Sequence, residues 1–435
     1  MKLRLPIFSF VLLLLFGQTC PVFCQQIIFN KVIPPDGKDF KWVAGITQDV
    51  NGYMWYATQK GLYRYDGYHM TTYKSNPINP NSLMSNNLVS VLADSNGIIW
   101  IGSGGRGLDR LDPVTGIFTH FRHDSNDPAS LSNDLVTVIL KDKQENLWIG
   151  TYGGLDQFDP KTNKFIHYRY NANDPTSISN NKVRAIYEDR QGTIWIGTGS
   201  PYPWEGGGPE EGGLNRMNKK SGTFTHYFHD PNNIHSLVNN KVSAIFEDNQ
   251  GILWIGTAGN GLHRMNTQQG SFERIVYDPL HPGKLSGPAL TKESPEQSHI
   301  TFITQDAAGS FWIGSSDDGL NYFNPGNRKI IHYKGKDNSS AGINDIGVWK
   351  AFTSRDGILW IGTWQGNLYR IDPFQWNIPH YASPGSVIVS FYEESGILWI
   401  GTEEEGLFRK DLTTGNVKRY VHDPLNPASL GNNYI

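Results

Sequence analysis

Aspartates recur along the sequence a few residues ahead of tryptophans, and carboxylates at a regular spacing could supply acid and base catalysis. Asp94, for example, precedes Trp100 in the segment DSNGIIWIGS. A general acid and base must converge on one substrate. Each aspartate stands in a separate copy of the segment, so we expect the carboxylates to stabilise turns, and we predict no catalytic residues. The six aspartates are Asp49, Asp94, Asp142, Asp189, Asp248 and Asp306.

Histidines form a second recurrent set that could, in principle, bind a metal. Each of five histidines is followed by Phe or Tyr: His120, His167, His226, His332 and His380. A zinc site needs three or four donors at about 2.0–2.3 Å from one ion. We place these histidines on outer strands, far from one another. With no Asp-x-Asp-x-Asp-Gly calcium loop either, the sequence predicts neither a metal site nor a cofactor.

The composition narrows the fold and the partners. The chain has 47 glycines, 13 tryptophans and 12% aromatic residues, which favours short strands joined by tight turns. The formal net charge is −3, so the chain lacks the basic surface that duplex DNA or RNA requires. We therefore expect no nucleic-acid partner.

The first residues are typical of an export signal. Lys2 and Arg4 precede an apolar run over residues 7–16, which is about half of the ~20 residues that a membrane-spanning helix needs. We predict a signal peptide over residues 1–24, with cleavage after Cys24. This would remove both cysteines, Cys20 and Cys24, and place the mature protein in the periplasm or outside the cell.

A tryptophan-centred segment is the repeat that organises the chain. Copies such as DRQGTIWIGT and DNQGILWIGT recur at a period of roughly 40–60 residues, the range of propeller repeats. We expect each tryptophan to be an apolar wedge between neighbouring sheets, and the glycine two residues later to permit their close approach. The repeated tryptophans are Trp55, Trp100, Trp148, Trp195, Trp254, Trp312, Trp360 and Trp399.

Each repeat can be divided into four strands. In the second copy these are residues 88–93, 98–103, 108–112 and 117–123, separated by Asp/Gly and Pro/Gly turns. A single four-stranded antiparallel sheet cannot cover its own apolar faces, so the units must stack radially. The sequence predicts an all-β fold, a β-propeller of four-stranded antiparallel blades.

The repeat count suggests two parts. We expect residues 25–376 to form a first propeller of seven repeats and residues 377–435 to form the start of a second, with one eight-bladed ring as the alternative. Either residues 27–32 or residues 377–382 would supply the outer strand that closes the first ring.

Loops between second and third strands project from the same end of a propeller as the links between blades. Two insertions, residues 199–211 and 278–298, fall on this end. Aromatic, acidic and amide side chains there suit a small polar ligand such as an oligosaccharide, although an inserted Gly/Pro-rich loop can also be mere surface. The candidate ligand-binding residues are Arg106, Tyr152, Tyr202, Trp204, Glu205, Asp317, Asp318, Trp364 and Gln365.

Three sequence features recur over residues 27–435: WIGT turns, third strands such as GLDRLDP and NLYRIDP, and links such as NDPASLSN. In these features the chain resembles the two-component regulator propeller repeats of bacterial sensor kinases. The resemblance implies two seven-bladed propellers in a periplasmic sensor that often detects glycan fragments. A β-sandwich, a membrane helix and a histidine kinase, which feeds a phosphorelay, would follow them.

This chain contains only the sensor part of that arrangement. Its last residues, LGNNYI, match the start of another repeat, so we interpret it as a truncated sensor. The resemblance implies a homodimer and an inner-membrane anchor, both through the absent C-terminal region, and kinase activity only there. Two alternatives remain open: a propeller enzyme acting on carbohydrate, either a lyase or a glycosidase, and a protein-interaction platform.

Overall fold

Four-stranded antiparallel sheets make up the computed structural model. It describes residues 27–202, 205, 211–259, 261–275, 278, 280–281, 298–306, 308–326, 328–333, 343, 345–372, 387–412 and 414–435. The predicted signal peptide lies outside these residues. The described part contains eight such sheets, which confirms the all-β class and the four-stranded antiparallel unit. No helix in this part of the chain could cross a membrane.

The strand bounds follow the repeat. The first three complete sheets contain β2 (Val43–Gln48), β3 (Met54–Thr58), β4 (Gly61–Tyr65), β5 (Met70–Tyr73), β6 (Leu88–Ala93), β7 (Ile99–Ser103), β8 (Leu108–Asp112), β9 (Ile117–Phe121), β10 (Val136–Lys141), β11 (Leu147–Thr151), β12 (Gly154–Asp159) and β13 (Lys164–Tyr168). The next three contain β14 (Val183–Glu188), β15 (Ile194–Thr198), β16 (Gly213–Asn218), β17 (Thr223–Tyr227), β18 (Val242–Glu247), β19 (Leu253–Thr257), β20 (Leu262–Asn266), β21 (Ser271–Ile275), β22 (Ile300–Gln305), β23 (Phe311–Ser315), β24 (Leu320–Asn324) and β25 (Lys329–Tyr333). The last two contain β1 (Asn30–Val32), β26 (Val348–Thr353), β27 (Leu359–Thr363), β28 (Leu368–Ile371), β29 (Ile388–Glu394), β30 (Ile397–Thr402), β31 (Leu407–Asp411) and β32 (Val417–Tyr420).

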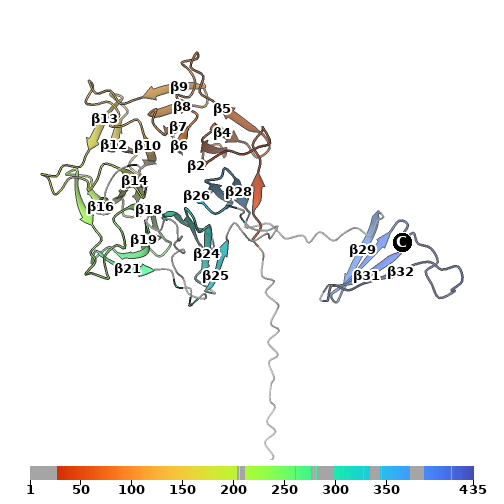
Figure 1. The fold of residues 1–435 in the computed structure, drawn as a ribbon. Helices are drawn as coiled ribbons and strands as arrows, with labels where there is room; N and C mark the ends of the chain where they lie inside the picture. Colours follow the sequence, from red (N-terminus) through yellow and green to blue (C-terminus); the bar gives the residue numbers. More distant parts are fainter. Residues whose placement is uncertain are drawn as a thin grey trace, which may run out of the picture. The chain divides into compact units, whose positions relative to one another are not determined.

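The chain divides into two compact units, residues 1–374 and 375–435. In the first unit the sheets follow one another around an axis (Figure 1). The first strand of each sheet contacts the first strand of the next, from β2 through β6, β10, β14, β18 and β22 to β26, and β26 contacts β2 again. The cycle is therefore closed. The second unit contains the sheet β29–β32.

The first described strand closes the cycle. β1 pairs antiparallel with β28, with Val32 opposite Leu368, so the last sheet of the first unit has the order β1-β28-β27-β26. Just ahead of β1, the Phe29 ring lies 4.8 Å from that of Tyr333. Of the two segments considered for this role, residues 27–32 therefore supply the closing strand, whereas residues 377–382 lie outside the described residues.

Each repeated tryptophan of the first unit is buried between sheets. Trp195 is 1% exposed, and Trp100 clusters with Leu147 and Phe158 of the following sheet and with Leu131 in the link that leads to it. Trp399, in the second unit, is partly exposed. A Cβ on Gly150 would lie 2.7 Å from Cγ1 of Val183 in the next sheet, so only glycine allows this close approach.

The indole of each buried tryptophan also bonds the turn residue six positions earlier, which is an aspartate in every sheet of the first unit but the last. Trp195 Nε1 donates to Asp189 Oδ2 at 2.8 Å, while Asp189 Oδ1 accepts the backbone N–H groups of Gln191 and Thr193. The same bond joins Asp49, Asp94, Asp142, Asp248 and Asp306 to their tryptophans. In the last sheet of the first unit, Ser354 Oγ accepts from Trp360 at 3.2 Å. One carboxylate thus fixes both the turn and the wedge.

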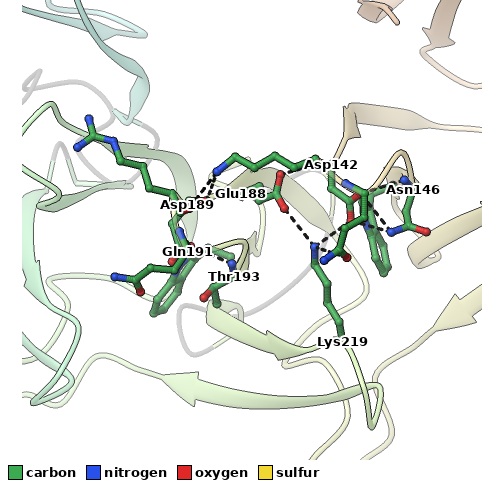
Figure 2. Close-up of polar contacts among 12 residues, drawn as sticks. Asp142, Asn146, Glu188, Asp189, Gln191, Thr193 and Lys219 are labelled. Carbon is green, nitrogen blue, oxygen red and sulfur yellow. Dashed lines mark hydrogen bonds and ion pairs between the residues drawn. The ribbon is translucent and has the colours of Figure 1, made fainter. Parts of the chain in front are cut away.

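Neighbouring sheets are joined through these same aspartates. Lys219, in the turn after β16, lies 2.9 Å from the Asp142 carboxylate of the preceding sheet and 3.2 Å from Glu188 of its own sheet (Figure 2). Burial by itself would raise the pKa of Asp142, but hydrogen bonds from Trp148, Asn146 and Lys219 outweigh it and lower the pKa to about 2. The aspartate is therefore ionised over the whole physiological range.

The outer histidines have a structural role within their own sheets. His167 Nδ1 lies 2.7 Å from Asp156 on the third strand, and its Nε2 lies 2.9 Å from the Pro128 carbonyl of the preceding link. His120 repeats this arrangement with Asp109 and Pro80. We expected these histidines to pair across blades. His120 and His167 instead pair with the third strand of their own sheet. His380 lies outside the described residues.

Candidate ligand-binding site

Three of the predicted residues meet at one end of the cycle of sheets. Tyr152 follows β11, and Glu205 and Tyr202 belong to the insertion after β15. The Tyr152 hydroxyl and the Ser200 hydroxyl both donate to the Glu205 carboxylate. Lys182 Nζ donates to the Glu205 backbone carbonyl at 2.7 Å. The inserted segment is therefore held over the neighbouring sheet by specific bonds.

Arg184, on the innermost strand β14, joins the two tyrosines. Its Nη1 donates to the Tyr152 hydroxyl at 2.9 Å, and its guanidinium carbon lies 5.4 Å from the centre of the Tyr202 ring. Burial raises the pKa of Tyr202 to about 12, although Arg184 opposes this shift. Burial also raises the pKa of Tyr152 well above its ordinary value. Both phenols are therefore neutral donors at any physiological pH.

A continuous series of ring contacts runs from Tyr202 to Trp364. The Tyr202 and His299 rings are 5.6 Å apart, and His299 lies 5.7 Å from Trp349. Trp349 in turn contacts Trp42 at 4.9 Å and Trp364 at 5.2 Å, each distance measured between ring centres. Trp364 is 48% exposed, so the series ends at the surface. These rings form an aromatic wall over this end of the fold.

Below the wall, a cavity of about 290 Å³ runs along the innermost strands. Arg184, His299, Trp42 and Trp349 line it, together with Lys350 on β26. It continues past Tyr187 and Phe246 further along β14 and β18. Four of these lining residues also contact the predicted site. Arg184 contacts Tyr152 and Tyr202, His299 contacts Tyr202, and Trp42 and Trp349 contact Trp364. The polar groups and rings of the surface lead directly into the interior.

The remaining predicted residues have separate positions. The Asp317 carboxylate accepts hydrogen bonds from the Ser298 and Ser315 hydroxyls, and its charge contributes to the raised pKa of Tyr202. The Asp318 backbone N–H donates to Ser315 Oγ. Arg106 and Gln365 are exposed and take no part in the series of contacts. Trp204 lies outside the described residues.

Five residues of this site were missed in the sequence: Trp42, Arg184, His299, Trp349 and Lys350. The predicted residues all come from loops, whereas these five lie in or next to innermost strands. A signal was present. The strands VTVILK, VRAIYE, VSAIFE, ITFITQ and VWKAFT align position by position. Arg184, Trp349, Lys350 and Phe302 are the large or charged departures in the second and third positions, and the first three of them belong to the site.

Within the described residues, no three His, Cys, Asp or Glu side chains form a group that could hold a metal ion. The site offers hydrogen-bond donors, two cations and aromatic faces. Such a set can bind and orient a polar organic molecule, because a few placed polar groups and several aromatic faces are the usual lining of a small-molecule pocket.

Comparison with protein families supports the repeat assignment. The family described as two component regulator propeller matches four segments, residues 82–105, 130–153, 177–200 and 236–259. Each segment includes a repeated tryptophan and its turn aspartate. A comparison with curated proteins found no match.

Several solved structures share the fold. The chain superposes on the extracellular domain of BT3049, described as a hybrid two-component system of B. thetaiotaomicron, with a TM-score of 0.64 and 24% identity, covering 90% of this chain and 49% of that one. The extracellular domain of BT4673 from B. thetaiotaomicron gives 0.60 and 18%, covering 94% and 49%. Virginiamycin B lyase from Staphylococcus aureus gives 0.54 and 14%, covering 79% and 98%.

The chain spans about half the length of the two B. thetaiotaomicron domains. At these identities the likeness shows the fold and nothing further. The fold, the closed cycle of four-stranded sheets and the four matched segments agree with one another: the chain carries repeats of the two-component regulator propeller family.

Proposed function

We propose that this chain is the extracytoplasmic ligand-sensing part of a two-component signal transduction system and has no catalytic activity of its own. The matched repeats and the shared fold with extracellular domains of hybrid two-component systems support this proposal. In this proposal the protein is exported by its signal peptide, and residues 25–376 form one propeller while residues 377–435 begin another. The signal passes to a histidine kinase that this chain does not contain, in a homodimer of the longer sensor.

The ligand binds at the end of the first unit that carries Tyr152, Tyr202 and Trp364. The observation that carries this assignment is the unbroken series of contacts from Glu205 through Arg184 and His299 to Trp364, directly above the axial cavity. Aromatic faces beside hydroxyl and guanidinium donors suit the alternating apolar and polar faces of a sugar ring. A glycan fragment is therefore the ligand class that we propose.

A binding experiment with a turnover control tests this function. We expect calorimetric titration of the purified chain with a panel of glycan fragments to give saturable binding to some of them, and mass spectrometry to recover each fragment unchanged. Formation of a cleaved product would overturn the sensing proposal in favour of a carbohydrate-active propeller enzyme.

Two variants test the location of the site. Tyr202→Ala and Trp364→Ala should each weaken binding about tenfold or more, because each removes one aromatic face from the wall. Tyr68→Ala is the matched control, since Tyr68 is 91% exposed in the turn between β4 and β5. Equal binding by all three variants would show that the ligand binds elsewhere.

A further inference from the structure

In three of the innermost strands the second residue has a short hydroxyl side chain that joins neighbouring sheets. In β10, β18 and β22 these residues are Thr137, Ser243 and Thr301. Each hydroxyl donates at 2.6 Å to a backbone carbonyl at the start of the next sheet's innermost strand. The hydroxyl therefore ties two sheets together, and a short side chain is sufficient.

Arg184 replaces that hydroxyl in β14. Its guanidinium makes no bond of this kind and extends to Tyr152 and Tyr202 at the mouth of the cavity. An arginine has five N–H donors, and Arg184 uses some of them on the phenol oxygens of Tyr152 and Tyr202. Among the described residues it forms no ion pair. Arg184 is therefore placed to bind something besides the protein.

Lys350, in the third position of β26, gives a second and independent sign. The other innermost strands have Gly45, Ser90, Val138, Ala185, Ala244 and Phe302 at this position. In the described part of the chain, no residue lies within hydrogen-bond or ion-pair distance of the Lys350 ammonium. Its surroundings lower the pKa of Lys350 by desolvation. The side chain is partly exposed and lines the cavity, so its ammonium is open to an anion that enters there.

The two cations share one cavity, and no carboxylate is among the described residues of its wall. Arg184 and Lys350 line it together, with His299 beside them. The carboxylates of Glu205 and Asp317 lie at the mouth, outside the described lining of the cavity, where each is held by hydrogen bonds from neighbouring hydroxyls. A low-dielectric cleft with charges of one sign concentrates ions of the opposite sign. The field in this cavity therefore favours an anion.

We propose that the ligand is an acidic saccharide whose carboxylate or sulfate group binds in the axial cavity between Arg184 and Lys350, with its sugar rings against the aromatic wall. The inference rests on the proposed function and specifies its ligand. At about 290 Å³ the cavity is at the lower limit of small-molecule pockets, about 300–1,000 Å³. It therefore holds one sugar unit, and the rest of the chain lies outside, over Tyr202 and Trp364.

Calorimetry with matched saccharides tests the proposal on the whole chain. The three probes are an oligosaccharide that ends in a uronic acid, the same oligosaccharide with the carboxyl reduced to the alcohol, and a sulfated counterpart. We expect at least one acidic form to bind about tenfold tighter than the neutral form or better, since charge-assisted bonds to guanidinium are roughly twice as strong as neutral ones. The comparison of uronic acid with sulfate then identifies the anionic group.

Charge-removing variants connect the effect to these two residues. Arg184→Gln and Lys350→Met should each abolish the preference for the acidic probe, so that the acidic and neutral probes bind each variant with equal affinity. Arg110→Gln is the control. Arg110 is on β8, where its guanidinium lies over the Trp100 ring, and it is not part of the axial cavity. The thermal midpoint of Lys350→Met should be at least that of the wild type, since a partly desolvated charge is removed, and this shows that the variant is folded.

The outcomes separate the two proposals. Neutral probes that bind as tightly as acidic ones, or an acid preference that survives in both variants, would overturn the anion site and leave the sensing function intact. Failure of every saccharide to bind the wild-type chain would overturn the proposed function and this inference with it.

Discussion

Lys219 Nζ lies 2.9 Å from the Asp142 carboxylate of one sheet and 3.2 Å from the Glu188 carboxylate of the next (Figure 2). Asp142 is fully buried, and the lysine is 20% exposed. Lys219→Met should lower the free energy of unfolding by about 1–3 kcal/mol, since it removes hydrogen bonds to two charged groups and leaves the aspartate with neutral donors. Urea denaturation measures the loss.

The control for Lys219 is an exposed ion pair in the same protein. Lys164 pairs with Asp127, whose side chains are 49% and 36% exposed, respectively. Lys164→Met should leave the urea midpoint unchanged. An equal loss in the two variants would mean that the bridge between sheets contributes no more than a surface pair.

The lowered pKa of Asp142 makes a prediction about acid stability. Its pKa is about 2 in the folded chain, against an ordinary value of 3.8. A carboxyl with a lower pKa when folded stabilises the native state above the unfolded pKa, and this stabilisation is lost as the pH falls through the folded value. In Asp142→Asn, the decline in stability between about pH 4 and pH 2 should be shallower than in the wild type. Urea midpoints measured across that range provide the comparison, and parallel curves would contradict it.

The bond between indole and aspartate predicts unequal costs for one substitution. Trp195→Phe should destabilise by about 2–4 kcal/mol, because it opens a cavity and deprives the buried Asp189 carboxylate of its donor. Trp360→Phe removes the same ring volume but leaves only the neutral Ser354 hydroxyl without its donor, so it should cost about 1–2 kcal/mol less. The loss of stability of each variant is measured by thermal unfolding and compared. If they lose equal stability, packing alone explains the tryptophans.

Closure by β1 predicts sensitivity to the removal of a few residues. A chain beginning at Pro34 lacks β1 and the Phe29 contact with Tyr333, so β28 becomes an unpaired edge. Its thermal midpoint should fall by several degrees compared with a chain beginning at Ile27, which retains both. Identical midpoints would show that the ring does not depend on this strand.

Much of the fold could be predicted because the repeat carries it. The innermost strand expected over residues 88–93 is β6 (Leu88–Ala93), and the third strand over residues 108–112 is β8 (Leu108–Asp112). Turn residues and alternating apolar residues mark these bounds directly. The indole bond of Asp94 could not be predicted in this way, because sequence spacing does not show where the free carboxylate oxygen points.

The site was predicted less completely, for a physical reason. Tyr152, Tyr202, Glu205 and Trp364 were identified because they stand in loops at the expected end. Arg184 and Lys350 stand in strands, where a bulge shifts the register after the first residue, between Val183 and Ala185 and between Val348 and Lys350. Simple alternation along a strand does not reveal such a bulge. Alternation alone therefore does not place these two cations beside the axis.

The pairing of β1 with β28 also sets an order of events during translation. At about 5–20 residues per second, Leu368 leaves the ribosome on the order of tens of seconds after Val32, its partner in the ladder. Until then β1 is a free strand that could pair with another nascent chain. It is only three residues long and contains Lys31, and both properties discourage such mispairing. The brevity of the closing strand thus protects the protein while it is being made.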